Sequence, residues 1–381
     1  MDKVSLTNHG HARPVHRPQE PHVAQRTATG LPGEDGRTAT EARRRGLLTG
    51  GGSRALGLWL LLVAVLAVCA LSITVGTRPI GLGTVWQALT DASTPGDETV
   101  IIRELRVPRT LLGVLAGLAL GVSGALMQGH TRNPLGDPGL LGVTAGASFA
   151  VVLSISLLGL TTPAGYVWAA FAGALLGSVA VFAIGSSGRG GATPVSLALA
   201  GTALTALLWA LIQSITIREQ TTLDAFRFWV VGALAGRDST VVTQVAPFVA
   251  IGLVLALVNA PALNLLNLGE DVARGLGQRV WLARTVGLGA ITLLTGAATA
   301  ACGPIAFVGL VVPHVARAVT GPDHRWLVPY SGLLGIVFLL LADVLGRVIA
   351  RPGELQVGIV LAVVGAPFFI ALVRRRRLVQ L

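Results

Sequence analysis

The sequence predicts an all-α, polytopic membrane protein with about ten transmembrane helices. Of its 381 residues, 52% are hydrophobic and only 12% are charged, whereas a soluble domain carries roughly 25% charged residues. The mean hydropathy is +0.71, and the apolar residues gather in runs of about 20, the length that a helix needs to cross a bilayer. The 49 glycines favour close helix packing, and Gly117/Gly121 and Gly173/Gly177 have the spacing that such contacts use.

Ten apolar runs define the predicted spans, and an even number places both chain ends on one side of the membrane. Arginines at 43–45 and 374–377 flank the first and last spans. Because cytoplasmic segments are enriched in positive charge, we expect both termini in the cytoplasm. The spans are expected near residues 55–74, 110–128, 140–160, 164–184, 195–217, 241–259, 281–301, 303–317, 328–344 and 357–373.

Residues 1–54 differ from the spans in composition. They are rich in Arg, His, Pro, Gly and Thr and lack apolar periodicity, so they bury too little surface to fold. The sequence therefore predicts a disordered cytoplasmic tail at 1–54 and one transmembrane domain at 55–381. The net charge of +11 comes from arginines at span ends and in the tail, which fits a membrane topology and does not indicate nucleic-acid binding.

The second predicted span begins with two arginines, Arg106 and Arg109, and Pro108 lies between them. Proline suits the first turn of a helix, and residues three apart lie on roughly one helix face. Two interpretations remain open. Either the arginines snorkel toward the membrane interface, or they are exposed cations that bind acidic groups of an external partner, for which guanidinium groups are well suited.

A polar bend follows the second span. Asn133-Pro134 and Asp137-Pro138 each place a polar residue before a proline, which removes a backbone donor and disfavours helix. The Asn and Asp side chains are expected to satisfy the freed backbone groups. Irregular backbone at membrane depth must face protein or water, so the bend is either a connector between helices or a cytoplasmic gate.

Residues 269–277, between the sixth and seventh spans, predict one or two short helices along the cytoplasmic surface. Glu270 and Asp271 begin the segment, where the helix dipole favours acidic residues. Gly277 suits the left-handed conformation that ends many helices. Such a segment is a docking element only if a cytoplasmic partner exists.

Two later segments are unusual for membrane spans. Glycine and proline interrupt residues 303–317, which predicts an irregular helix buried against protein. Asp343 is the only acid well inside a span, and ionisable residues inside membranes are often functional. Here a structural ion pair competes with that interpretation, because Arg347 lies one helical turn later on the same face.

The sequence lacks the residues that several classes of protein function require. Lys3 is the only lysine, which excludes a nucleotide-binding P-loop, since that motif needs a lysine after its glycine-rich loop. Cys69 and Cys302 form no CxxC pair. The sequence contains no HExxH zinc motif, no GxSxG motif and no paired carboxylates inside a span. We therefore expect no enzymatic activity, no cofactor and no metal site.

Taken together, several segments resemble the permease subunits of FecCD-type, or type II, ABC importers, which take up iron–siderophore complexes, haem and vitamin B12 in bacteria. The resemblance implies a multi-pass protein of the bacterial cytoplasmic membrane that pairs with a second copy or a sister permease. It also implies two separate ATP-binding cassette subunits and a periplasmic or lipid-anchored substrate-binding protein as partners. The segments are residues 102–147, 197–201, 228–236, 267–277, 303–317, 323–325 and 365–373.

The resemblance also implies roles for individual residues. Those that contact the binding protein would be Arg106, Arg109 and Arg347. Those that couple the permease to the ATPase would be Gly269, Glu270, Asp271, Ala273, Arg274, Gly275 and Gly277. Those that narrow the cytoplasmic exit would be Asn133, Leu135, Pro194 and Val195; some family members carry small hydroxyl residues at the last two positions.

The leading hypothesis is a permease that imports an iron–siderophore complex and is driven by ATP hydrolysis on a partner chain. Vitamin B12 and haem are the alternative cargoes. An ATP-independent secondary carrier is a further alternative, but a single membrane acid makes ion coupling less favoured. A membrane enzyme lacks a nucleophile or ligand cluster, and a scaffold leaves the bends and the arginines unexplained.

Overall fold

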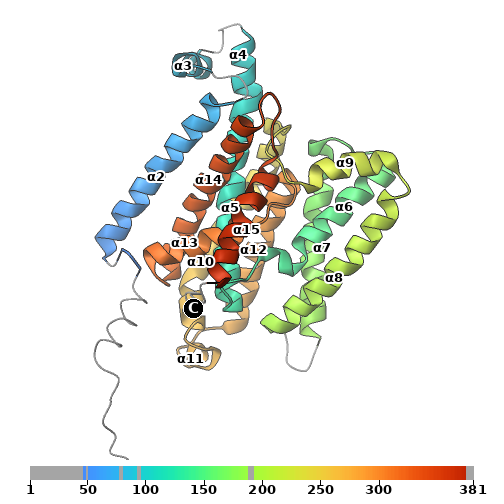
Figure 1. Cartoon of the computed structure of the whole chain (residues 1–381). Coiled ribbons are helices and arrows are strands. Elements are labelled where there is room, and N and C mark those ends of the chain that lie inside the picture. Colours follow the sequence, from blue (N-terminus) through green and yellow to red (C-terminus); the bar gives the residue numbers. More distant parts are fainter. Residues whose placement is uncertain (1–45, 49, 77–79, 92–95, 188–192, 375–381) are drawn as a thin grey trace, which may run out of the picture. The chain divides into compact units, whose positions relative to one another are not determined.

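The computed structural model describes residues 46–374, except 49, 77–79, 92–95 and 188–192. Residues 1–45 of the predicted tail and the arginines at 375–377 lie outside this part. The described residues form helices and connecting loops (Figure 1). In chain order the helices are α2 (Gly51–Thr74), α3 (Leu82–Thr90), α4 (Asp97–Val100), η1 (Ile101–Arg106), α5 (Val107–Thr131), η2 (Pro138–Leu141), α6 (Val143–Leu158), α7 (Pro163–Ser186), α8 (Pro194–Thr216), α9 (Gln220–Val230), α10 (Ser239–Leu266), α11 (Glu270–Gly275), α12 (Val280–Cys302), α13 (Val308–Thr320), α14 (His324–Ile349) and α15 (Val357–Arg374).

The predicted all-α membrane fold is confirmed, and each predicted span coincides with a helix. Within the described residues, seven helical segments are long and apolar enough to cross a membrane, and α6, α13 and α15 are shorter apolar helices. Local sequence signals set several of the helix starts. Proline lies in the first turn of α5, α7 and α8, and Asp238 caps α10 by accepting a hydrogen bond from Val241 N, as N-terminal signals predict.

The eighth predicted span begins later than expected. Residues 303–307 are not helical, and α13 starts only at Val308. Gly303 and Phe307 have positive φ angles of 78° and 69°, which interrupt a right-handed helix. A Cβ atom at Gly303 would lie 2.1 Å from the carbonyl oxygen of Trp229 in α9. The irregular backbone is therefore packed against protein, as a lipid environment requires.

Helix α5 is the most buried long span, and it packs against α10, α12, α13 and α14 (Figure 1). Glycines allow the close approach to α14. A Cβ added at Gly117 would lie 2.6 Å from the carbonyl oxygen of Gly335, and a Cβ added at Gly121 would lie 2.1 Å from the carbonyl oxygen of Ser331. Helices α6 and α7 meet in the same way, since a Cβ at Gly173 would lie 2.3 Å from the carbonyl oxygen of Gly146. The helix contacts predicted from glycine spacing are thus present.

The last residues of the predicted tail belong to the helical domain. The backbone amides of Leu47 and Leu48 donate to the carbonyl oxygens of Ala318 (3.2 Å) and Val319 (2.9 Å), at the end of α13. The hydroxyl of Tyr330 on α14 donates to the carbonyl oxygen of Arg54 (2.6 Å). Since α2 itself begins at Gly51, the chain is already fixed to α13 and α14 before the predicted boundary at residue 54.

The candidate residues gather at two opposite ends of the helical domain (Figure 1). At one end α5 begins, α14 ends and α9 lies across the domain; we call this the α9 end. At the other, α5 ends, α8 and α14 begin, and α11 connects α10 to α12; we call this the α11 end.

Candidate functional site

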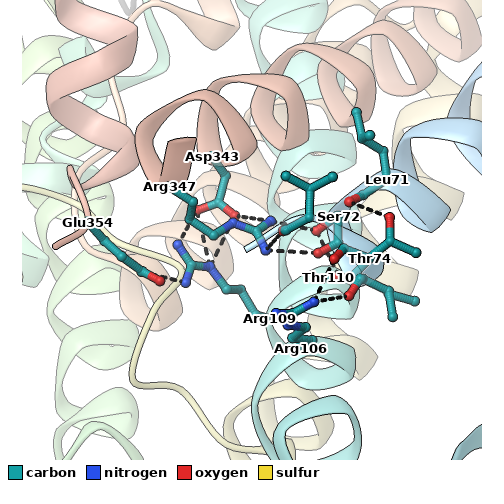
Figure 2. A network of polar contacts seen from close by, with 11 residues as sticks. Leu71, Ser72, Thr74, Arg106, Arg109, Thr110, Asp343, Arg347 and Glu354 are labelled. Carbon is teal, nitrogen blue, oxygen red and sulfur yellow. Dashed lines mark hydrogen bonds and ion pairs between the residues drawn. The ribbon is translucent and has the colours of Figure 1, made fainter. Parts of the chain in front are cut away.

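A buried ion cluster lies at the α9 end (Figure 2). Arg109, in the first turn of α5, holds Asp343 of α14 with two nitrogens, Nε to Oδ2 at 3.0 Å and Nη2 to Oδ1 at 2.8 Å. Its third nitrogen, Nη1, donates to Glu354 Oε2 at 2.7 Å. Arg347 Nη2 pairs with Asp343 Oδ2 at 2.9 Å. The predicted pair of Asp343 and Arg347 is present, but Asp343 also neutralises an arginine that lies far away in the sequence.

Arg347 of this cluster and the neighbouring Arg106 also bind the end of α2. Arg106 Nη1 donates to the carbonyl oxygens of Ile73 (2.7 Å) and Thr74 (2.8 Å). Arg347 Nη1 donates to the carbonyl oxygens of Ser72 (2.8 Å) and Val75 (2.9 Å). The final carbonyls of a helix lack partners within it, and here the two guanidinium groups supply the missing donors.

The interpretation of Arg106 and Arg109 as exposed cations is wrong for the isolated chain. Arg106 is 6% exposed, and the side chains of Arg109 and Arg347 are 12% and 2% exposed. A buried guanidinium requires a partner to offset its desolvation, and the α2 carbonyls and two acids meet that requirement.

Two adjoining cavities nevertheless reach these buried groups at the α9 end. One, of about 560 Å³, is lined by all three arginines and by Glu354. The other, of about 450 Å³, shares Arg109 and Glu354 with it and extends to Trp229 of α9. The charged cluster therefore faces open space as well as protein.

The polar bend satisfies its own backbone, as its Asn and Asp residues predict. Asn133 Oδ1 accepts from Leu135 N (2.9 Å), and Asp137 Oδ1 accepts from Gly139 N (2.7 Å). Burial raises the pKa of the Asp137 carboxyl above its ordinary value, and the hydrogen bond from Gly139 opposes this shift. Both side chains thus shape the turn between α5 and η2.

A third cavity, of about 390 Å³, lies beside this bend at the α11 end. Its lining includes Asn133 from the bend together with Pro194 and Val195 from the start of α8. His130 and Arg284 contribute polar groups, and most of the remaining lining is apolar. The structure therefore brings together three of the four residues predicted to narrow the exit, whereas Leu135 is not among the lining residues.

The predicted surface segment at 269–277 forms the short helix α11. Gly277 has a φ of 82°, so it takes the expected left-handed conformation. Ala273 is fully buried and fixes the helix to the domain. Arg274, one turn after Glu270 and Asp271, pairs with both acids at 3.1 and 2.9 Å.

Two features of α11 were not predicted from the sequence. Three exposed apolar side chains follow one another at intervals of four residues, and they are Leu268, Val272 and Leu276. Val272 lies within α11, Leu268 lies in the turn that precedes it and Leu276 directly follows it, and these positions are visible in the sequence once the helix is recognised. In addition, Arg284 of α12 forms an ion pair with Glu270.

The described residues do not offer a metal site, because they contain no group of three or more His, Cys, Asp or Glu side chains placed to hold an ion. The chemistry of both ends is that of ion pairs, hydrogen bonds and apolar surface.

The chain is similar to known proteins of one transport family. Residues 62–375 match the FecCD transport family. The chain is 46% identical to the ferric enterobactin transport system permease protein FepD of Escherichia coli over 324 residues, which cover 85% of this chain and 96% of the relative. It is 42% identical to the iron(3+)-hydroxamate import system permease protein FhuB of Bacillus subtilis, with 85% of each chain covered. Relatives with 37% and 38% identity are permeases named for cobalamin and hemin.

A solved structure has a similar fold. It is an inward-facing conformation of a metal-chelate type ABC transporter, with a TM-score of 0.73 and 26% sequence identity. The similarity covers 84% of this chain and 98% of the other.

Proposed function

Because the chain belongs to the FecCD transport family, we propose that it is the permease subunit of an ABC importer that moves an iron–siderophore complex across a bacterial cytoplasmic membrane. It is a multi-pass membrane protein, and its family members are transport permeases. The observation that carries the proposal is the 46% identity to a ferric enterobactin permease over 96% of that protein. ATP hydrolysis belongs to separate subunits, in keeping with a sequence whose only lysine is Lys3.

The cargo is tested by uptake into proteoliposomes that contain the permease, its ATPase and its binding protein. We expect ATP-dependent uptake of ferric enterobactin, and little uptake of hemin or cyanocobalamin. Preference for either of these two would instead support the second candidate, the same role with haem or vitamin B12, which rests on the less similar relatives. Uptake by the permease without the ATPase would support a secondary carrier and contradict the proposal.

We propose that the α11 end faces the cytoplasm and that its cavity is the exit gate. Asn133, Leu135, Pro194 and Val195 are its proposed gate residues. Both termini would then be cytoplasmic, because α2 begins at this end and the predicted number of spans, ten, is even. The central path would be completed by a second copy of this chain or by a sister permease.

The α9 end is the proposed docking site of the external binding protein. Arg106, Arg109 and Arg347 line the 560 Å³ cavity there, and guanidinium groups bind carboxylates well. Since the three arginines are already paired within the chain, a carboxylate of the binding protein would have to compete with Glu354 for Arg109. Glu354 is the more exposed of the two acids, at 33%.

Replacing Glu354 tests this competition. We expect Glu354→Gln to strengthen docking of the binding protein up to about five-fold at low salt, because a partly exposed ion pair contributes about 0.2–1 kcal/mol. Affinity is measured by surface plasmon resonance on the permease–ATPase complex in nanodiscs. Glu104→Gln is the control, since Glu104 lines the same cavity without an ion pair to Arg109. Unchanged or weaker docking of Glu354→Gln would refute the competition.

Helix α11 is the proposed contact with the ATPase. The exposed side chains of Val272 within α11, and of Leu268 and Leu276 on either side of it, offer apolar surface for a partner. The proposed coupling residues, Glu270 and Arg274 among them, are on the same short segment.

Disrupting α11 should therefore reduce transport even where the ATPase still hydrolyses ATP. We expect Gly275→Pro to lower ATP-dependent uptake at least about ten-fold while the protein still inserts, because proline disrupts the end of the helix. Gly275→Ala is the matched control, since a Cβ there meets no atom within 4 Å. Uptake by the proline variant equal to that of the alanine variant would contradict the assignment.

A further inference from the structure

We propose that Arg284 is a positioning residue that transmits movement of α11 to the exit cavity at the α11 end. The inference rests on the proposed function, because it assumes that α11 receives the movement from the ATPase. Arg284 itself was not among the residues expected to couple or to gate.

Arg284 contacts α11 and also lines the exit cavity. Its Nη2 atom forms an ion pair with Glu270 Oε1, while Arg274 Nη2 takes the other carboxylate oxygen, Oε2, at 3.1 Å. Arg284 also lines the 390 Å³ cavity together with Asn133 and Val195. One side chain therefore joins the first residue of α11 to the space between the bend and α8.

The backbone around Arg284 is held firmly. Asn259 of α10 donates through Nδ2 to the carbonyl oxygen of Ala283 at 2.7 Å, and its Oδ1 atom lies 3.1 Å from His130 Nε2 on α5. A Cβ at Gly287 would lie 1.8 Å from the same His130 nitrogen. Helices α5, α10 and α12 are thus fixed to one another on one side of the cavity, next to the peptide that precedes Arg284.

The opposite side of the cavity is the beginning of α8, which packs on α6, α7 and η2. If α12 is fixed and α11 shifts, the Glu270 carboxylate moves and the guanidinium of Arg284 follows it. That displacement changes the charge and the free space beside Pro194 and Val195. Because both members of the pair are about 30% exposed, at 28% and 32%, their attraction is modest and its loss should leave the fold intact.

The test follows nucleotide-dependent cross-linking across the cavity in the complete permease–ATPase complex. Cys69 and Cys302 are replaced by alanine, and cysteines are introduced at Thr131 and Leu199, which line the same cavity from α5 and α8 and are not among the proposed gate residues. A bifunctional maleimide is applied with and without ATP plus vanadate. In this parent we expect the cross-linked fraction to change at least about two-fold with nucleotide.

The measured quantity is the ratio of the cross-linked fractions with and without nucleotide. With Arg284→Gln added, we expect this ratio to become about one while ATP hydrolysis continues. Arg284→Lys should retain the nucleotide-dependent change, since it keeps a positive charge opposite Glu270 and leaves the pair of Glu270 with Arg274 in place. Arg279→Gln is the control, because this exposed arginine also lies between α11 and α12 and does not line the cavity; its ratio should equal that of the parent.

A parent-like ratio in Arg284→Gln would overturn the inference and leave the proposed function standing. Loss of hydrolysis in Arg284→Gln would also overturn it, because the residue would then serve assembly. If the parent complex hydrolysed no ATP, or if its cross-linked fraction were the same with and without nucleotide, the proposed coupling and the inference would both be overturned.

Discussion

A Gly121→Val variant should fail to accumulate as folded protein. Gly121 lies where the backbone of α5 meets that of α14, and a single added Cβ would already be 2.1 Å from the carbonyl oxygen of Ser331. The obstructing atom belongs to the backbone of a long helix, so it cannot rotate away as a side chain would. We expect a loss of stability at or above the upper end of the ~1–3 kcal/mol typical of overpacking, measured as monodisperse yield and thermal stability in detergent.

Gly289→Val provides the matched control. Gly289 also lies within a long span, α12, but a Cβ there meets no atom within 4 Å. Its yield should be close to that of the unmodified protein. Equal yields for Gly121→Val and Gly289→Val would show that α5 and α14 are not in such close contact.

The second large effect is expected at Asp343. This carboxylate is 1% exposed and balances the charges of both Arg109 and Arg347. Asp343→Asn keeps the size of the side chain and removes its charge, leaving two cations without their shared counter-ion. Breaking a buried pair by removing one partner costs about 3–5 kcal/mol, so the variant should unfold at a clearly lower temperature.

The measurement is the unfolding temperature in detergent or nanodiscs, compared with that of Asp224→Asn. Asp224 pairs with Arg227 at 3.0 Å, but both groups are well exposed, so its replacement should change stability by less than about 1 kcal/mol. If the Asn variants at 343 and 224 were equally stable, the cluster would not hold α5 to α14.

The positions of the spans could be predicted from the sequence because the bilayer fixes the length and polarity of each one. Local rules also predicted the first turn of α5 at Pro108, the hydrogen bonds of Asn133 and Asp137 within the bend, and the left-handed Gly277. Each of these depends only on residues that are close in the chain. The late start of α13 was missed because it depends on the approach of Gly303 to Trp229 in another helix.

The candidate sites were only partly predictable for the same reason. Arg109 and Asp343 are 234 residues apart, and no local pattern shows that they meet. Arg106 was expected at the surface, but the carbonyls that it binds belong to a different helix. The pairing of Arg284 with Glu270 likewise requires α11 to fold back against α12, which the sequence pattern of either helix does not reveal.

The contacts of α2 have a consequence for how the chain is assembled on the ribosome. Arg347, which secures the end of α2, follows Ser72 by 275 residues, so at roughly 5–20 residues per second its synthesis comes about 14–55 s later. Arg106 follows Ile73 by only 33 residues, so it is made first and can bind the last carbonyls of α2, while most of the helix still faces lipid. Helix α2 has the highest mean hydropathy of the long spans, 2.8, and only 17% of its most apolar window is buried in protein. Its apolar side chains are therefore suited to contact lipid until α14 is made and Arg347 completes the contacts at the end of α2.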